Sequence, residues 1–217
     1  MNMKKILILV EGQTEESFVK NILNPGLSSN DLYVVPIIIT TKVVKNGPNF
    51  KGGVNSYTTI KKEVQKLLRD SSAMAVTTMI DFYKIPNDFP SWSSNGNCYD
   101  KVTAAECAFR DDINQDRFIP YLQLHEFEGL LFSVPEVISD ALDRKKKQEV
   151  QSIRTAFATP EEINNGEQTH PSMRLISLFP YYKKPIFGSI IARRIGIDQI
   201  KAACPHFNSW FVSLQSL

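Results

Sequence analysis

The stretch that decides the fold is Lys5-Ile6-Leu7-Ile8-Leu9-Val10-Glu11-Gly12-Gln13-Thr14-Glu15-Glu16-Ser17-Phe18, in which an apolar run ends at an acid followed by glycine. A short, branched-aliphatic run bounded by turn residues predicts a strand buried on both faces, as in the centre of a parallel sheet. Glu11 then lies at the carboxyl end of that strand, the edge where open parallel sheets bind ligands. Gly12 permits a tight turn, and the acids after it are typical of the first turn of a helix.

A single acid at a strand end also has a structural explanation. Glu11 alone is compatible with a cap on the following helix or with a lysine partner. The functional interpretation therefore depends on whether other acids reach the same edge.

The composition indicates one globular domain with no strong charge. The chain has 217 residues, is 42% hydrophobic and carries a formal net charge of +2, so any nucleic-acid partner must be held by local basic patches. Three cysteines without a C-x-x-C pair favour a reducing compartment and exclude a disulfide framework. Glu11 interrupts the N-terminal apolar run before a secretion signal forms, and no stretch is long enough to span a bilayer. We expect a soluble, cytoplasmic protein.

Strands alternate with helices through the first part of the chain. Further strands are predicted at 32–41, 74–80 and 118–124, and helices at 13–23, from Ser56 onward and at 99–113. Asn24-Pro25-Gly26 predicts the end of the first helix. Pro36 indicates an edge strand or a bulge, because proline cannot donate to a ladder. The fold class is a mostly parallel α/β sheet flanked by helices, with a helical C-terminal extension. We expect a single domain over 1–217, with its core at about 1–133 and the helical elaboration at about 134–217.

Two other predicted strands also end in acids. Asp81 follows 74–80, and His125-Glu126-Phe127-Glu128 follows 118–124. Carboxylates gathered at one edge repel one another unless a cation lies among them, and oxygen ligands select Mg²⁺ or Mn²⁺. We therefore predict metal ligation by Glu11, Asp81, Glu126 and Glu128.

The geometry of the His125–Glu128 run depends on its secondary structure. In a strand both glutamates face one side, whereas on a helix residues two apart diverge, and we then favour Glu128 over Glu126. His125 is a candidate proton carrier, with a structural hydrogen bond as the alternative.

Basic residues gather in two places that are candidates for phosphate contacts. A glycine-rich stretch carries Lys42, Lys45 and Lys51, and a C-terminal stretch carries Lys184, Arg193 and Arg194. Solvated loops and helix faces are the alternative in both places. The long segment 82–97, rich in proline and turn residues, is of a kind that often forms functional lids or insertions.

Three motifs together resemble a known family. Val10-Glu11-Gly12-Gln13-Thr14-Glu15, Leu122-Gln123-Leu124-His125-Glu126-Phe127-Glu128 and Ala202-Ala203-Cys204-Pro205-His206-Phe207 resemble the bacterial domain-of-unknown-function family 4276 over nearly the whole chain. About the first 130 residues also resemble the TOPRIM domain of topoisomerases, primases and overcoming-lysogenization-defect nucleases.

The TOPRIM resemblance implies roles for particular residues. Glu11 matches the glutamate proposed as general acid or base, and Asp81 matches the first acid of an Asp-x-Asp motif. The chain departs from that motif because Tyr83 stands where the second aspartate is expected. One metal ligand is thereby lost unless Glu126, Glu128 or Asp88 replaces it.

The resemblance implies a TOPRIM-like nuclease that uses Mg²⁺ or Mn²⁺ to cleave phosphodiesters in DNA or RNA. Glu11, Asp81, Glu128 and His125 are its candidate catalytic residues. Related domains imply a setting in bacterial anti-phage defence and an ATPase partner protein. The alternative is a non-catalytic TOPRIM-like binding or assembly subunit of a defence complex, which Tyr83 favours.

Overall fold

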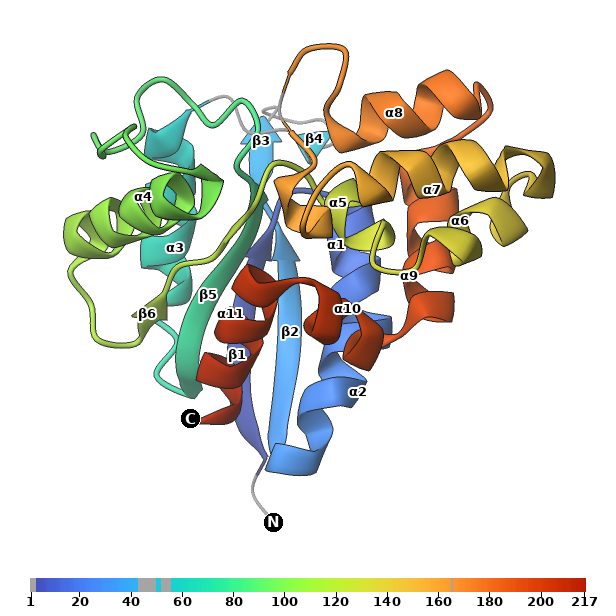
Figure 1. Ribbon diagram of the computed structural model, residues 1–217. Helices are drawn as coiled ribbons and strands as arrows, with labels where there is room; N and C mark the ends of the chain where they lie inside the picture. Colours follow the sequence, from blue (N-terminus) through green and yellow to red (C-terminus); the bar gives the residue numbers. More distant parts are fainter. Residues whose placement is uncertain (1–2, 43–49, 52–55, 165) are drawn as a thin grey trace. The chain divides into compact units, whose positions relative to one another are not determined.

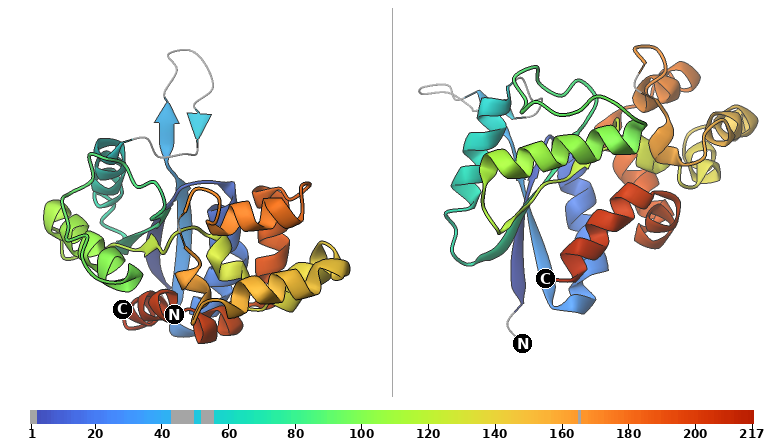
Figure 2. Two further views of the ribbon diagram at one scale, coloured as in Figure 1. Left: turned by 45° about the horizontal axis from the view of Figure 1, so that its top comes forward. Right: turned by 60° about the vertical axis from the view of Figure 1, so that its left-hand side comes forward.

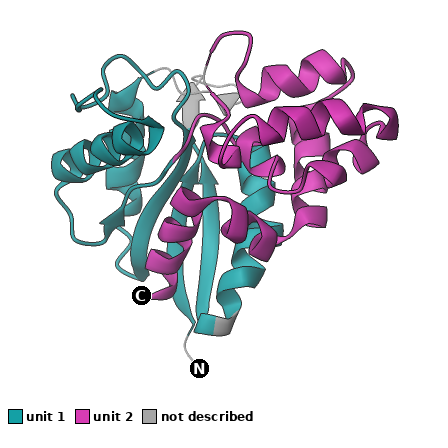
Figure 3. Cartoon of the chain, viewed as in Figure 1, with its two compact units in different colours: residues 1–122, 217 teal, residues 123–216 magenta. Residues whose placement is uncertain are grey.

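The computed structural model describes residues 3–42, 50–51, 56–164 and 166–217. They divide into two compact units, residues 1–122 with Leu217 (unit 1) and residues 123–216 (unit 2), shown in Figure 3. The sequence places both in a single domain with a core to about residue 133, which stays a prediction. No helix among the described residues combines the length and the apolar character needed to cross a bilayer.

A mostly parallel sheet forms the centre of unit 1 (Figure 1). Its strands run in the order β2 (Leu32–Ile38), β1 (Lys4–Val10), β5 (Ala73–Asp81) and β6 (Phe118–Ile119), and each neighbouring pair is parallel. The short β7 (Leu122–Gln123) also pairs with β5, while β3 (Thr40–Lys42) and β4 (Phe50–Lys51) form a separate antiparallel pair. The predicted parallel fold is confirmed, and β2, which carries Pro36, is an edge strand as predicted.

The two central strands are buried because helices cover both faces of this sheet. The side chains from Ile6 to Val10 are at most 5% exposed, as expected for strands covered on both sides. Helices α3 (Tyr57–Leu67) and α4 (Cys98–Ile113) cover one face, and α1 (Gln13–Phe18) with α2 (Asn24–Leu27) covers the other (Figures 1 and 2).

The helix after β1 continues past its predicted end. A π-helical turn, Val19–Leu23, links α1 to α2, which contains Pro25 near its start, and a 3-10 turn, Ser28–Asn30, follows. A π turn shifts the hydrogen-bond register by one residue, and such a turn beside a proline accommodates the missing donor. Asn24 also accepts a hydrogen bond from the Val34 amide (2.9 Å), which ties this helix to β2. The prediction that Asn24-Pro25-Gly26 stops the helix is therefore wrong.

The predicted strand 118–124 is divided into β6 and β7, with Pro120 between them. Thr78 of β5 fills the gap, because its hydroxyl donates to the Tyr121 carbonyl (2.8 Å) and accepts from the Tyr121 amide (3.0 Å). The prediction of a single continuous strand over 118–124 is therefore wrong. The proline lacks the donor that a continuous ladder needs.

Unit 2 is helical, as the sequence predicts for the C-terminal part. Its helices are α5 (Glu128–Leu131), α6 (Pro135–Ala141), α7 (Lys147–Thr155), α8 (Pro171–Leu178), α9 (Ser189–Ile195), α10 (Ile197–Ala203) and α11 (Pro205–Gln215). Short 3-10 turns lie at Arg144–Lys146 and Pro160–Glu162, and a π turn lies at Lys184–Gly188. Buried aromatic side chains form much of its core: Phe127, Phe132, Phe179, Phe207 and Phe211.

Candidate functional site

Glu11 and Asp81 lie on neighbouring strands at the carboxyl edge of the unit 1 sheet. β2 lies on one side of β1 and β5 on the other, so the chain reverses its winding direction between β1 and β5. Ligands of open parallel sheets bind at such a switch point. The Asp81 amide donates to Glu11 Oε2 at 3.4 Å, and both side chains are half-buried. The sequence thus locates two acids that the fold brings together.

The turn after Glu11 brings a further acid close to the same strand end. Glu15, in the first turn of α1, is only 3% exposed. A Cβ added at Gly12 would lie 3.3 Å from Glu15 Oε2, so a side chain at position 12 would press on this carboxylate. The sequence analysis assigned Glu15 only to the first turn of the helix. It did not single out Glu15 as a candidate site residue.

The segment 82–97 makes hydrogen bonds and an aromatic contact with the start of α3. Asp88 accepts hydrogen bonds from the Tyr57 amide (2.8 Å) and the Ser56 hydroxyl (3.1 Å), so it caps α3 from outside the helix. These bonds, the Tyr57 amide first, lower the pKa of Asp88. Phe89 packs edge-on against Tyr57, with ring centroids 4.9 Å apart. Ser56 is the N-cap residue as predicted, but the capping oxygens belong to Asp88, the proposed substitute for the missing aspartate.

His125 lies in a turn between β7 and α5. Its φ is +58°, in the left-handed region, which is uncommon for residues other than glycine. The ring is 6% exposed, and its Nδ1 has no hydrogen-bond partner among the described residues. Burial lowers the pKa of His125 from 6.5 to about 4, so the imidazole is neutral near pH 7. A neutral ring can accept a proton but supplies no positive charge to a phosphate.

Glu126 is held at the start of α8 in unit 2. Its Oε2 lies 2.9 Å from His170 Nδ1 and accepts from the Ser172 amide at 2.9 Å, while Oε1 accepts from the Ser172 hydroxyl at 3.2 Å. The Ser172 hydroxyl is also 3.1 Å from the same His170 Nδ1. A catalytic Ser–His–acid triad uses the two ring nitrogens separately, so this arrangement is a helix cap rather than a triad.

Glu128 is the first residue of α5 and is completely buried. Its Oε2 lies 3.2 Å from Lys184 Nζ, and its Oε1 accepts a long hydrogen bond (3.5 Å) from the Tyr182 hydroxyl. Burial, followed by the nearby Glu128 charge, raises the pKa of Tyr182 well above its usual range. The run His125–Glu128 is thus a turn leading into a helix, and its two glutamates meet different partners.

Glu161 is a buried acid that the sequence analysis did not single out. It is 1% exposed, and its two oxygens accept from the amides of His206 and Phe207, each at 2.9 Å. These amides belong to the first turn of α11, which starts at Pro205. The Pro-His-Phe sequence at this helix start was part of the family resemblance, and the structure shows that it meets a glutamate 45 residues away.

The structure describes only some of the lysines and arginines predicted to bind phosphate. Lys45 lies outside the described residues, and only the backbone of Lys42 and Lys51 is described. Lys184 is engaged with Glu128, whereas Arg193 and Arg194 are exposed on α9. Their role in nucleic-acid binding stays a prediction.

The fit of a divalent ion rests on the sheet edge of unit 1. Among the described residues no group of three or more histidine, cysteine, aspartate or glutamate side chains is arranged to hold a metal. Glu11 and Asp81 nevertheless offer two hard carboxylates, and Mg²⁺ is commonly bound by one or two carboxylates together with water and substrate phosphate. Glu126 and Glu128 belong to unit 2, and their convergence with this pair stays a prediction.

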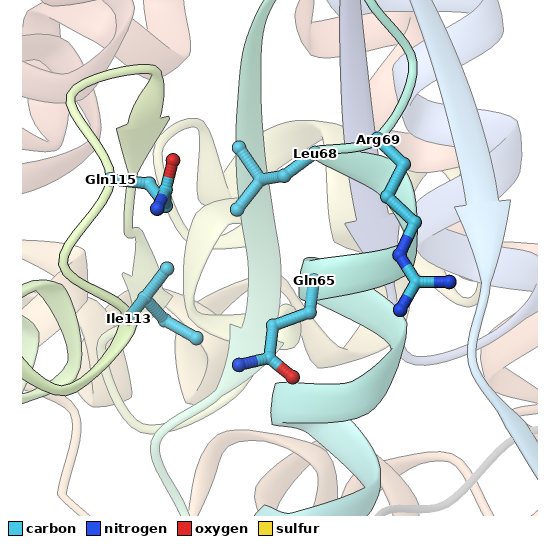
Figure 4. A pocket seen from close by; sticks show the side chains of 5 residues that line it. All are labelled: Gln65, Leu68, Arg69, Ile113 and Gln115. Carbon is cyan, nitrogen blue, oxygen red and sulfur yellow. The ribbon is translucent and has the colours of Figure 1, made fainter.

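A pocket of about 220 Å³ lies elsewhere in unit 1, between the end of α3 and the segment after α4 (Figure 4). It is lined by Gln65, Leu68, Arg69, Ile113 and Gln115, none of which is a predicted site residue. Its volume is below that of most small-molecule sites. The pocket therefore does not compete with the sheet edge as the candidate site.

The chain belongs to the family described as domain of unknown function (DUF4276), whose model matches residues 10–215. This confirms the family predicted from the three sequence motifs. Among curated proteins there is no significant match. Among solved structures, the chain is similar to the C-terminal region of the OLD protein of Xanthomonas campestris pv. campestris, with 16% identity and a TM-score of 0.39 over 98% of this chain and 96% of that one. A superposition this loose does not by itself establish a shared fold.

Proposed function

We propose that the protein is a TOPRIM-like, metal-dependent nuclease that cleaves phosphodiester bonds in nucleic acid, in a bacterial anti-phage setting. The observation that carries the proposal is the pair of acids, Glu11 and Asp81, on adjacent parallel strands at the switch point of the sheet. The resemblance of the first 130 residues to TOPRIM nucleases supplies the reaction class. The hydrogen bond from the Asp81 amide to Glu11 Oε2 links the two half-buried acids without substrate, which favours a preorganised site.

In this proposal Glu11 and Asp81 hold Mg²⁺ or Mn²⁺ at the sheet edge. The ion, when bound, polarises a phosphoryl oxygen and lowers the pKa of a bound water. Glu11 also matches the TOPRIM residue proposed to exchange a proton with the reacting groups. The Asp81 amide donates to the Glu11 carboxylate and so orients it.

A second candidate is a non-catalytic binding or assembly subunit. It is favoured by Tyr83, which stands in place of the second aspartate, and by the ion pair that the buried Glu128 makes with Lys184. A carboxylate that already faces an ammonium group has less to gain from a metal ion.

The test compares Mn²⁺ binding and cleavage in purified wild-type protein, Glu11→Gln and Asp81→Asn. Plasmid DNA, single-stranded DNA and RNA are each incubated with Mg²⁺ or Mn²⁺, and Mn²⁺ binding is followed by calorimetry. We expect both variants to lose cleavage by at least about 100-fold, the scale expected when a group that stabilises the transition state is removed, and to bind Mn²⁺ more weakly.

Glu16→Gln is the matched control, because Glu16 lies on the same helix start but pairs with Lys20 at 2.7 Å. It should keep both activities. Equal cleavage by Glu11→Gln and wild type would remove the assignment of the site. Wild-type protein that neither cleaves any substrate nor binds Mn²⁺ would support the assembly subunit instead.

A further inference from the structure

One helical face of unit 2 exposes isoleucines where a surface helix normally carries polar side chains. Ile186, in the π turn Lys184–Gly188, is 53% exposed, and Ile190, in α9, is 42% exposed. Arg193 and Arg194, also exposed, follow Ile190 by three and four residues. Residues at these spacings share one face of a helix, so the four side chains form a continuous stripe, named here the 186–194 stripe.

The opposite side of the same helix explains why the stripe points outward. Ile191, Ala192 and Ile195 are buried, and α9 contacts α5 and α6 through this inner side. The exposed isoleucines are therefore not displaced core residues. They form a second apolar surface on a helix whose core-facing side is already complete.

The chain segment that carries the stripe has charges of one sign only. No acidic residue occurs between Phe179 and Ile197, while this segment contains Lys183, Lys184, Arg193 and Arg194. Lys184 lies against Glu128, but no ion pair or side-chain hydrogen bond engages Lys183, Arg193 or Arg194 within the described part of the chain. Two aliphatic side chains are thus flanked by three uncompensated positive charges.

We propose that the 186–194 stripe docks an acidic amphipathic segment of a partner protein. Apolar side chains of that segment would pack on Ile186 and Ile190, and its carboxylates would pair with Arg193 and Arg194. Arginine beside exposed apolar residues is the composition of protein interfaces, and charge complementarity gives such contacts their specificity. The proposal stands whether the protein is a nuclease or an assembly subunit.

A nucleic-acid surface is the nearest alternative, and the isoleucines argue against it. Phosphates and sugars accept hydrogen bonds from cationic and polar groups, and exposed bases stack on aromatic rings. The branched aliphatic side chains of Ile186 and Ile190 offer neither interaction. They would bury apolar surface only against a partner that presents apolar side chains of its own.

The first experiment places a photo-crosslinking amino acid at position 190 of the full-length protein in its native host. A matched control carries it at position 212, because Val212 on α11 is 50% exposed yet the sequence of α11 contains no arginine. We expect adducts from position 190 that map by mass spectrometry to a segment with both acidic and apolar residues. No adducts beyond those of position 212, or adducts with nucleic acid, lipid or a second copy of this chain, would overturn the proposal.

The second experiment measures the affinity of the mapped segment, made as a fluorescent peptide, by anisotropy. We expect R193E/R194E and I186S/I190S each to weaken binding at least tenfold, with V212S unchanged. A peptide whose acids are replaced by lysines should not bind. Binding that is insensitive to R193E/R194E contradicts the docking mode, and unchanged circular dichroism of the variants shows that they are folded.

Discussion

The acids at the sheet edge of unit 1 and those inside unit 2 are alike in sequence but differ in what surrounds them. Glu11 and Asp81 are half-buried at the ends of parallel strands. Glu126, Glu128 and Glu161 are at most 8% exposed, and each meets a helix start or a cation. An acid next to an apolar run is therefore no sign of function by itself, because the surroundings of the carboxylate differ from one such acid to the next.

Helix capping at long range explains two of the buried carboxylates, Glu126 and Glu161. Glu126 reaches the start of α8 and Glu161 the start of α11, and both helices begin with a proline. The first amides of any helix have no intrahelical acceptor, and proline at the first position has no N–H to satisfy. A carboxylate accepts from the amides that follow and complements the helix dipole. In unit 1 Asp88 does the same for α3.

The largest effect expected from this comparison is that of Glu161→Ala. The substitution leaves two amides at the start of α11 without an acceptor in a buried place, and we expect a loss of about 2–3 kcal/mol in the free energy of unfolding. Urea denaturation measures it as a lower midpoint at constant slope. Glu162→Ala is the control, because Glu162 is half-exposed and accepts one hydrogen bond, from Ala158 at 3.2 Å. Similar losses in both variants would contradict the capping role.

The fold was predictable from local pattern, and both failures in placing its elements occur at prolines. The run from Ile6 to Val10 defines β1, and Pro36 correctly marks the edge strand. The predicted helix stop at Asn24-Pro25-Gly26 is wrong because the helix continues through Pro25 after a π turn. Turn rules based on residue type do not predict this. Pro120 divides the last strand, and there a threonine hydroxyl replaces the ladder.

The candidate site was predictable only as far as parallel strands align their ends. That rule brings Glu11 and Asp81 together, since both acids follow buried neighbouring strands. It says nothing of His170, Ser172 or Lys184, which meet Glu126 and Glu128 from more than 40 residues away in the sequence. No period or motif encodes such pairs.

A smaller effect is expected for the Glu128–Lys184 pair, which tests whether Glu128 has a structural role. Glu128→Gln should cost about 2 kcal/mol, because Lys184 loses its buried partner but is itself 31% exposed. With Lys184→Met and the double variant, thermal and urea unfolding should give a coupling energy of about 1 kcal/mol. Additive losses would show that the two charges do not interact. If Mn²⁺ raises the stability of the wild type and Glu128→Gln abolishes this rise, Glu128 is supported as a metal ligand.

The smallest effect is expected for Asp112. This residue shows that an acid of unit 1 can also have a structural role when it has a partner. Asp112 lies in unit 1, yet it accepts a hydrogen bond from the Tyr57 hydroxyl and pairs with Lys61 at 2.9 Å. These contacts, the Tyr57 hydroxyl first, lower its pKa below the usual 3.8. The folded state then favours the charged form, so this stabilisation is present above about pH 4 and is lost as the pH falls through the lowered pKa.

Because the side chain of Asp112 is 34% exposed, solvent screens the pair, and Asp112→Asn should cost at most about 1 kcal/mol at pH 7. The stability of this variant should approach that of the wild type as the pH falls through the lowered pKa of Asp112, measured by urea unfolding at a series of pH values. A difference that stayed constant with pH would mean that Asp112 acts through packing and not through its charge.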